Sequence, residues 1–286
     1  MNRVNQEIKS ENFVEINDKE FKLLSQLIYD KIGINLTDQK KTLLAGRLQK
    51  ILRQFEFKNF DEYYHYLTHD KSGRALSNLA NLISTNHTFF GREKDHFDYF
   101  KNFVLPQLVK KKNAQGNKDI RLWSAGCSSG EEPYTLVMYM MEYFGSDYKN
   151  WDAGILATDI SEPVLEKAKA GIYSADRLKS MDPVLKRKYF DKLSNEEYKV
   201  KDFVRREVLY RRFNLMNKTF PFKKPFDTIF CRNVMIYFDS QTRHELTEKF
   251  YRHTIKEGYL FIGHSETVNR ETTRYKYLKP AVYIKL

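Results

Sequence analysis

The sequence has few of the residues that mark secreted, disulfide-bonded or membrane proteins. Only two of its 286 residues are cysteines, Cys127 and Cys231. Both lie in strand-like segments, which favours reduced thiols over a disulfide framework. No apolar run approaches the roughly 18 residues of a membrane span, and residues 1–10 contain no apolar signal core. The seven histidines are scattered along the chain. We therefore expect a cytoplasmic protein without membrane insertion and without a metal site.

The composition favours a packed, basic protein. Hydrophobic residues make up 41% of the chain and aromatic residues 15%, which is enough for a core and argues against disorder. The net charge of +12 indicates a negatively charged partner. Nucleic acid, an anionic membrane and an acidic protein all fit this charge, and so does an ordinary solvated surface.

The first 84 residues are expected to form an all-α domain. Asn17 and Glu20 have the spacing of a capping box ahead of an apolar pattern of helical period. Gly46 interrupts the second helix, which predicts close packing there. The four helical patterns cover about 17–33, 37–55, a short stretch from 59, and 73–84.

From residue 120 onward, short apolar runs alternate with helical patterns. This alternation is typical of a mostly parallel sheet with helices on both faces, and predicts an α/β fold. The highly charged segment 175–206 interrupts it and predicts a small inserted β subdomain with a strand pair near 198–204. We expect a linker at 85–94 and a second domain at 95–286. The predicted strands are 120–125, 155–158, 208–213, 226–231, 259–263 and 281–285.

One loop carries the clearest chemical signal. The segment Leu122-Trp-Ser-Ala-Gly-Cys-Ser-Ser-Gly-Glu-Glu-Pro leads from a strand through two glycines into a helix. Glu131 and Glu132 at the helix start would repel a pyrophosphate, but they suit a cationic ligand such as S-adenosylmethionine. Asp159 ends the next strand, where an acid can accept both ribose hydroxyls. Alternatively, the glutamates complement the helix dipole and Asp159 caps the following helix.

Several motifs resemble the CheR-type chemotaxis protein-glutamate methyltransferases. They are Ser124-Ala-Gly-Cys-Ser-Ser-Gly-Glu-Glu-Pro-Tyr, Ala157-Thr-Asp-Ile, Gly171-Ile-Tyr, Asn214-Leu, Phe230-Cys-Arg-Asn-Val-Met-Ile-Tyr-Phe and Gly263-His-Ser-Glu. The resemblance covers nearly the whole chain. It implies a class I methyltransferase domain behind a helical substrate-recognition domain, with S-adenosylmethionine as cofactor and S-adenosylhomocysteine as product. It also implies that glutamate side chains in the cytoplasmic domains of chemoreceptors are the substrates.

The resemblance also assigns roles to individual residues. The linker contributes to the cofactor site, and Tyr237 matches a tyrosine placed near the transferred methyl group. A glutamate is already anionic at neutral pH, so the reaction needs orientation rather than a general base, and Arg92 and Tyr237 suit that task. Tyr237 can alternatively be a core aromatic. The implied cofactor-binding residues are Asn86, Thr88, Arg92, Glu132, Asp159, Asn214, Leu215, Arg232 and Asn233.

Two features depart from the family pattern. The family usually has Thr-x-Phe-Phe-Arg, whereas this chain has Thr88-Phe-Phe-Gly-Arg92, which puts the local packing in doubt. Some members also carry a glycine-rich loop in the inserted subdomain that grips a receptor pentapeptide. Residues 191–200 contain no glycine. We therefore predict that this protein does not require such a tether, and we expect a monomer.

The second helix is rich in positive charge. A basic helix could steer an acidic receptor helix and fix its register, although an ordinary solvated face fits as well. The candidate substrate-binding residues are Lys40, Arg47, Lys50 and Arg53. A methyltransferase acting on RNA or another protein, or a non-catalytic module that senses the cofactor, remains an alternative. Without an aromatic-interleaved recognition motif, we expect no nucleic-acid partner.

Overall fold

The computed structural model describes residues 13–84 and 87–286. Its N-terminal part consists of helices α1 (Asp18–Ile32), α2 (Lys41–Gln54), α3 (Phe60–His69) and α4 (Arg74–Ile83), with a 3₁₀ turn η1 (Asp38–Lys40) before α2. Asn17 and Glu20 form the predicted capping box through two reciprocal hydrogen bonds of 2.9 Å. The buried faces of these helices share one apolar cluster. Gly46, however, is exposed, and a Cβ at this position would have no neighbouring atom within 4 Å, so the prediction of close packing there was wrong.

The second part is built on a seven-stranded sheet with the order β6-β2-β1-β7-β8-β10-β9. The first five of these strands are parallel to their neighbours, and the last two pair antiparallel. The strands are β1 (Leu122–Ala125), β2 (Ile155–Asp159), β6 (Val208–Arg212), β7 (Phe226–Cys231), β8 (Thr254–Ile262), β9 (Lys276–Lys279) and β10 (Val282–Ile284).

Two features of this sheet differ from the sequence prediction. Strand β8 starts at Thr254, five residues before the predicted start at 259. Strand β9 was not predicted, because as an edge strand it has no fully buried residue and therefore no clear apolar period. The remaining helices are α5 (Lys94–Tyr99), the π-helix η2 (Phe100–Val104), α6 (Leu105–Ala114), α7 (Glu131–Phe144), η3 (Gly145–Asn150), α8 (Glu162–Ala170), α10 (Asp202–Arg205), η5 (Met235–Tyr237) and α11 (Ser240–Arg252).

A three-stranded antiparallel sheet lies between α8 and β6 in sequence. It has the order β3-β5-β4 and comprises β3 (Ile172–Ser174), β4 (Phe190–Lys192) and β5 (Glu197–Val200), accompanied by η4 (Ala175–Leu178) and α9 (Pro183–Tyr189). The sheet begins at Ile172, three residues before the segment predicted as an insertion. The strand pair predicted near 198–204 was wrong in detail, because β5 ends at Val200 and residues 202–205 are helical.

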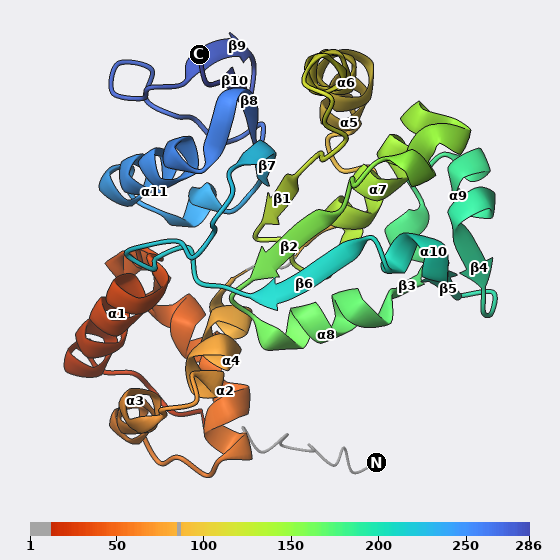
Figure 1. The fold of residues 1–286 in the computed structure, drawn as a ribbon. Coiled ribbons are helices and arrows are strands. Elements are labelled where there is room, and N and C mark those ends of the chain that lie inside the picture. Colours follow the sequence, from red (N-terminus) through yellow and green to blue (C-terminus); the bar gives the residue numbers. More distant parts are fainter. Residues whose placement is uncertain (1–12, 85–86) are drawn as a thin grey trace.

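The helical part packs against the carboxyl ends of the parallel strands, toward which the arrowheads of β2 and β6 point (Figure 1). Hydrogen bonds fasten the two parts together at several points. The Glu162 N–H donates to Ser77 Oγ at 2.7 Å, and the Asn35 N–H donates to the Tyr237 carbonyl at 3.0 Å. The Tyr29 hydroxyl donates to Asp239 at 2.8 Å. Within the described ranges, no helix is long and apolar enough to cross a membrane.

Candidate functional site

A cavity lies where the carboxyl ends of β1, β2 and β7 meet the helical part. Its wall includes Ile32, Ile34 and Ala80 from the helical part, so both parts of the chain enclose it. The structure brings nine of the ten predicted cofactor and catalytic residues to this one cavity; the tenth, Asn86, lies outside the described residues. The nine are Thr88, Arg92, Glu132, Asp159, Asn214, Leu215, Arg232, Asn233 and Tyr237.

The loop after β1 forms the floor of the cavity. The N–H groups of Gly126 and Cys127 both donate to the Thr158 carbonyl, at 2.8 and 2.9 Å, which ties the loop to β2. Gly126 has φ +83°, and a Cβ there would lie 2.4 Å from Val234 Cγ2. Only glycine accommodates both this backbone angle and this close approach. The predicted glycine requirement of the loop is therefore met at Gly126.

The two adjacent glutamates point to different surroundings. Glu131 is 1% exposed, accepts from Ser129 Oγ at 2.7 Å and lies 3.5 Å from the Arg177 guanidinium. Burial raises the pKa of the Glu131 carboxyl, while Ser129 and Arg177 oppose that shift. Glu132 instead lines the cavity and accepts from Ser124 Oγ at 2.7 Å. Of the pair, Glu132 is thus the acid available to a ligand.

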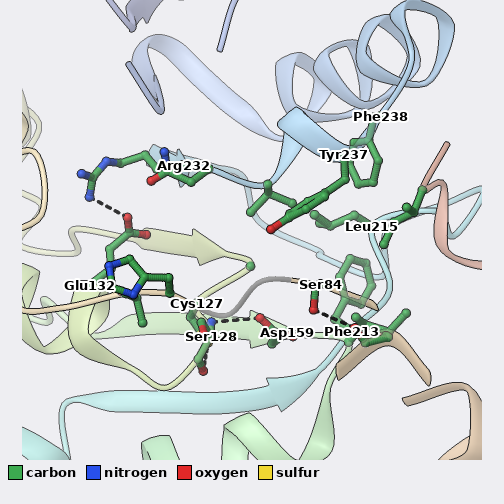
Figure 2. Close-up of a pocket in the computed structure, with 18 of the residues that line it drawn as sticks. Ser84, Cys127, Ser128, Glu132, Asp159, Phe213, Leu215, Arg232, Tyr237 and Phe238 are labelled. Carbon is green, nitrogen blue, oxygen red and sulfur yellow. Dashed lines mark hydrogen bonds and ion pairs between the residues drawn. The ribbon is translucent and has the colours of Figure 1, made fainter. Parts of the chain in front are cut away.

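Asp159 stands at the end of β2, on the same side of the cavity as the loop (Figure 2). Its carboxylate accepts from the Ser128 N–H and the Ser161 N–H, each at 2.9 Å. Burial raises the pKa of Asp159, and the hydrogen bonds from Ser161 and Ser128 oppose this. The bond to Ser161, the N-cap residue of α8, shows that Asp159 orders the start of that helix and also faces the cavity.

Arg232 joins three segments that are distant in sequence. Its guanidinium donates to Glu132 at 2.8 Å, to Glu93 at 3.1 Å and to the Arg92 carbonyl at 2.6 Å. The side chain is 3% exposed and lies over the Phe97 ring. Arg232 therefore forms an ion pair with Glu132 and links the Thr88–Arg92 segment to the end of β7.

Sequence analysis did not identify Glu93. Its carboxylate accepts from Arg232 and, at 3.2 Å, from the Asn233 amide. Burial raises the pKa of Glu93, but Arg232 and Asn233 outweigh burial and hold it below its usual value. In the sequence, only its position directly after Arg92 could have marked Glu93 as a site residue, because its partners are 139 and 140 residues away.

Tyr237 lies at the end of η5, opposite Asp159. Figure 2 shows its ring extending into the cavity, with the hydroxyl toward the open space. The ring also packs beside the apolar cluster of the helical part. The two interpretations of Tyr237 are therefore compatible: its ring packs against that cluster while its hydroxyl faces the site.

Asn214 was predicted to bind the cofactor, and it lines the cavity, but its side chain is hydrogen-bonded to the protein itself. Its amide donates to the Lys31 carbonyl at 2.6 Å, and its side-chain oxygen accepts from the Met216 N–H at 2.9 Å. Both ends of this side chain are thus engaged with protein, where they fasten the cavity wall to the end of α1. Leu215 beside it is 8% exposed and presents an apolar surface to the cavity.

The altered Phe-Phe-Gly-Arg segment packs well. Phe90 is fully buried and meets the rings of Tyr173 and Phe190 edge-on, at 4.9 and 5.1 Å. Gly91 has φ +82°, an angle that favours glycine. Arg92 reaches the cavity, and its guanidinium donates to the His87 carbonyl at 2.6 Å. The departure from the family pattern thus leaves Arg92 at the site.

Two of the histidines that are scattered in the sequence lie together in the structure. His96 and His264 lie with ring centroids 4.5 Å apart, and together with Glu93 they offer ligand atoms within 4.8 Å of one another. His96 is fully buried, and burial lowers its pKa to about 4, with Arg232 and His264 adding to the shift. Both oxygens of Glu93 already accept hydrogen bonds from Arg232 and Asn233.

The four candidate substrate-binding residues lie on η1 and α2. Lys50 and Arg53 are exposed, whereas Lys40 and Arg47 are half-buried. The Arg47 guanidinium donates to the Ile83 carbonyl at the end of α4, next to Ser84 in the cavity wall. Arg47 therefore joins α2 to the end of α4, and this hydrogen bond holds the basic helix beside the cavity.

The chemistry of the cavity fits S-adenosylmethionine. Glu132, although paired with Arg232, supplies carboxylate oxygens that can accept from an ammonium group, and Asp159 supplies acceptors for paired hydroxyls. The side chains of Phe213, Leu215 and Ile160 supply an apolar wall for an aromatic base.

Comparisons with known proteins agree with this geometry. Residues 19–84 match the family model described as CheR methyltransferase, all-alpha domain. Residues 86–284 match the model described as CheR methyltransferase, SAM binding domain. The chain is 45% identical over 272 residues to a chemotaxis protein methyltransferase of Borreliella burgdorferi, covering 95% of this chain and 96% of that protein.

Two other relatives have lower sequence identity, but they also match most of the chain. Identity is 33% over 271 residues to the chemotaxis protein methyltransferase of Escherichia coli, covering 94% of this chain and 91% of the relative. It is 35% over 248 residues to a probable chemotaxis protein methyltransferase of Rhizobium etli, covering 86% and 91%. Together with the family models, these relatives confirm the predicted resemblance, the class I methyltransferase fold and the S-adenosylmethionine cofactor.

Proposed function

The chain belongs to the CheR methyltransferase family, and we propose that it methylates glutamate side chains in the cytoplasmic domains of chemoreceptors. The products would be glutamate methyl esters and S-adenosylhomocysteine. The observation that carries this proposal is a single cavity whose wall contains Glu132, Asp159 and Tyr237 and which lies beside a basic helix. When bound, S-adenosylmethionine supplies the methyl group. Thr88, Glu132, Asp159, Leu215 and Asn233 would hold it.

Two residues of the cavity wall, Arg92 and Tyr237, suit an anionic nucleophile. A glutamate has a pKa near 4.3 and arrives ionised at neutral pH, so no side chain has to remove a proton. Tyr237 and Arg92 can donate to the carboxylate and orient it. The half-buried setting of both side chains limits water around the nucleophile. Their proposed task is therefore orientation and partial desolvation.

Replacing Tyr237 by phenylalanine tests this role. A hydrogen bond to a charged group contributes about 1.5–3 kcal/mol, which corresponds to a fall in kcat of about 10- to 150-fold. The assay uses labelled S-adenosylmethionine with purified receptor cytoplasmic fragments and measures base-labile methyl ester. Tyr277→Phe on the edge strand β9 is the matched control. Wild-type kcat in the Tyr237 variant would refute the proposed role.

We propose that α2 steers the substrate through Lys50 and Arg53. Arg47 anchors this helix at the cavity rim, and Lys50 and Arg53 lie one and nearly two turns further along. Lys50→Glu with Arg53→Glu should raise KM for an acidic receptor fragment at least fivefold and weaken its salt dependence, leaving KM for S-adenosylmethionine unchanged. Lys149→Glu on η3 is the control. An unchanged KM for the receptor would exclude this surface.

We further propose that no pentapeptide tether is required and that the enzyme acts as a monomer. Residues 193–196 join β4 to β5 in a tight turn in which Ser194 Oγ accepts from the Glu196 and Glu197 N–H groups. Receptor fragments with and without the C-terminal pentapeptide should give KM values within about twofold of each other. Tight binding of the free pentapeptide would contradict the first proposal, and a dimeric mass in light scattering would contradict the second.

The same assay separates the alternative functions. Methyl transfer to RNA or to a non-receptor protein, without receptor methylation, would favour another substrate class. Cofactor binding without transfer to any of these substrates would favour a sensing module.

A further inference from the structure

Glu266 lies outside the cavity, but its carboxylate contacts residues 233–236, which lead to Tyr237 in the cavity wall. It follows β8, is 5% exposed, and accepts from three backbone N–H groups. One oxygen accepts from Gly263 at 2.5 Å and from Asn233 at 2.8 Å, and the other accepts from Ile236 at 3.1 Å. The carboxylate therefore bridges the carboxyl ends of the neighbouring parallel strands β7 and β8.

The backbone that Glu266 holds has an unfavourable conformation. Asn233 has φ +60°, in the left-handed region that non-glycine residues rarely adopt. Gly263 must be a glycine, because a Cβ there would lie 2.5 Å from the side-chain nitrogen of Asn233 and 2.9 Å from both the Asn233 backbone nitrogen and a Glu266 oxygen. Such a conformation persists only where neighbouring groups fix it. Glu266 provides two such contacts, to the Asn233 and Ile236 N–H groups, and its bond to Gly263 ties them to the end of β8.

The segment held in this way builds one side of the site. Asn233, Val234 and Tyr237 line the cavity, and the Tyr237 N–H donates to the Val234 carbonyl at 3.3 Å. The Asn233 amide also reaches Glu93, which pairs with Arg232. A change in the backbone at Asn233 would therefore move Tyr237 and the Arg232 contacts together.

We infer that Glu266 is a positioning residue, which folds residues 233–237 so that Tyr237 faces the transferred methyl group. Only a carboxylate can accept from all three amides, because a glutamine in its place would turn an NH₂ group toward one or two N–H donors. The inference rests on the proposed role of Tyr237 for its effect on turnover. Its effect on backbone order does not depend on that role.

The test combines hydrogen exchange with kinetics on the full chain. In Glu266→Gln, amide exchange within residues 232–237 should rise at least tenfold, with no change across α8, which packs against α4, β2 and β6. The kcat for receptor fragments should fall at least tenfold, while the Kd for S-adenosylmethionine, measured by calorimetry, changes less than kcat. Glu271→Gln, an exposed glutamate five residues later, is the matched control and should match the wild type.

Glu266→Asp provides a second variant in case the glutamine variant does not fold. It keeps the charge but is one methylene shorter, so its exchange and kcat should lie between those of the wild type and the glutamine variant. Unchanged exchange at 232–237, or an equal rise throughout the chain, would overturn the inference. Localised exchange with wild-type kcat would also overturn it. Localised exchange with reduced kcat, alongside a fully active Tyr237→Phe variant, would instead overturn only the role of Tyr237.

Discussion

Replacing Arg232 by methionine should destabilise the protein strongly, because the arginine pairs two carboxylates at once. Methionine retains most of the apolar volume over Phe97 but leaves Glu93 and Glu132, each 14% exposed, without their cation. Removing one partner of a buried ion pair typically costs about 3–5 kcal/mol. For a domain of this size, that corresponds to a melting temperature lower by about 6–20 °C.

The control is Arg206→Met, since Arg206 is 75% exposed beside Glu207 at 3.6 Å. Such surface pairs contribute at most about 1 kcal/mol. Urea unfolding followed by circular dichroism measures both variants. A loss below about 1 kcal/mol for the Arg232 variant, or an equal loss for the control, would refute the view that Arg232 joins these segments.

The pH dependence of the same variant provides an independent check. In the wild type, the pKa of Glu93 lies below its usual value, so Glu93 stabilises the fold above its unfolded pKa and loses this effect as the pH falls through its folded pKa. Without Arg232, burial dominates and the pKa should rise above the unfolded value. The variant then regains stability when Glu93 is protonated. We expect the difference in unfolding free energy between variant and wild type to be larger at about pH 7.5 than at about pH 5, and a difference that grows toward the lower pH would contradict this.

Three further substitutions test other parts of the structure. His96 has a folded pKa of about 4 against 6.5 unfolded, so it costs about 2 kcal/mol at pH 5, and His96→Phe should flatten the stability profile between about pH 7.5 and 5 in thermal unfolding. Gly126→Ala places a Cβ against Val234 and should lower cofactor affinity at least tenfold by calorimetry, with a stability loss of about 1–3 kcal/mol. Asp227→Asn removes the buried partner of Lys112, 2.8 Å away, and should cost about 3–5 kcal/mol in urea unfolding.

Local signals predicted those parts of the structure whose contacts lie within a few residues. The Asn17–Glu20 capping box is one example, since both of its hydrogen bonds span three residues. The start of α7 is another, because Gly130 has a positive φ directly before Glu131 and follows the loop after a buried strand. Sequence patterns did not identify Glu93, and the Gly263-His-Ser-Glu motif marked the position of Glu266 without indicating its partners. The partners of Glu93 and Glu266 lie 139 and 33 residues away, so their contacts form only when the strands assemble.

Because contacts between residues far apart in sequence could not be predicted, the sequence indicated which side chains lie at the cavity better than it indicated their hydrogen-bond partners. Glu131 and Glu132 are chemically identical neighbours, yet helix geometry sends one to Ser129 and the other to the cavity. Asn214 lines the cavity as the family pattern implies, but its amide is engaged with Lys31 and Met216. A ligand at this position would therefore meet the backbone and the Leu215 side chain rather than a free amide. Family motifs specify which segments converge, and only the assembled contacts decide which atoms remain available for binding.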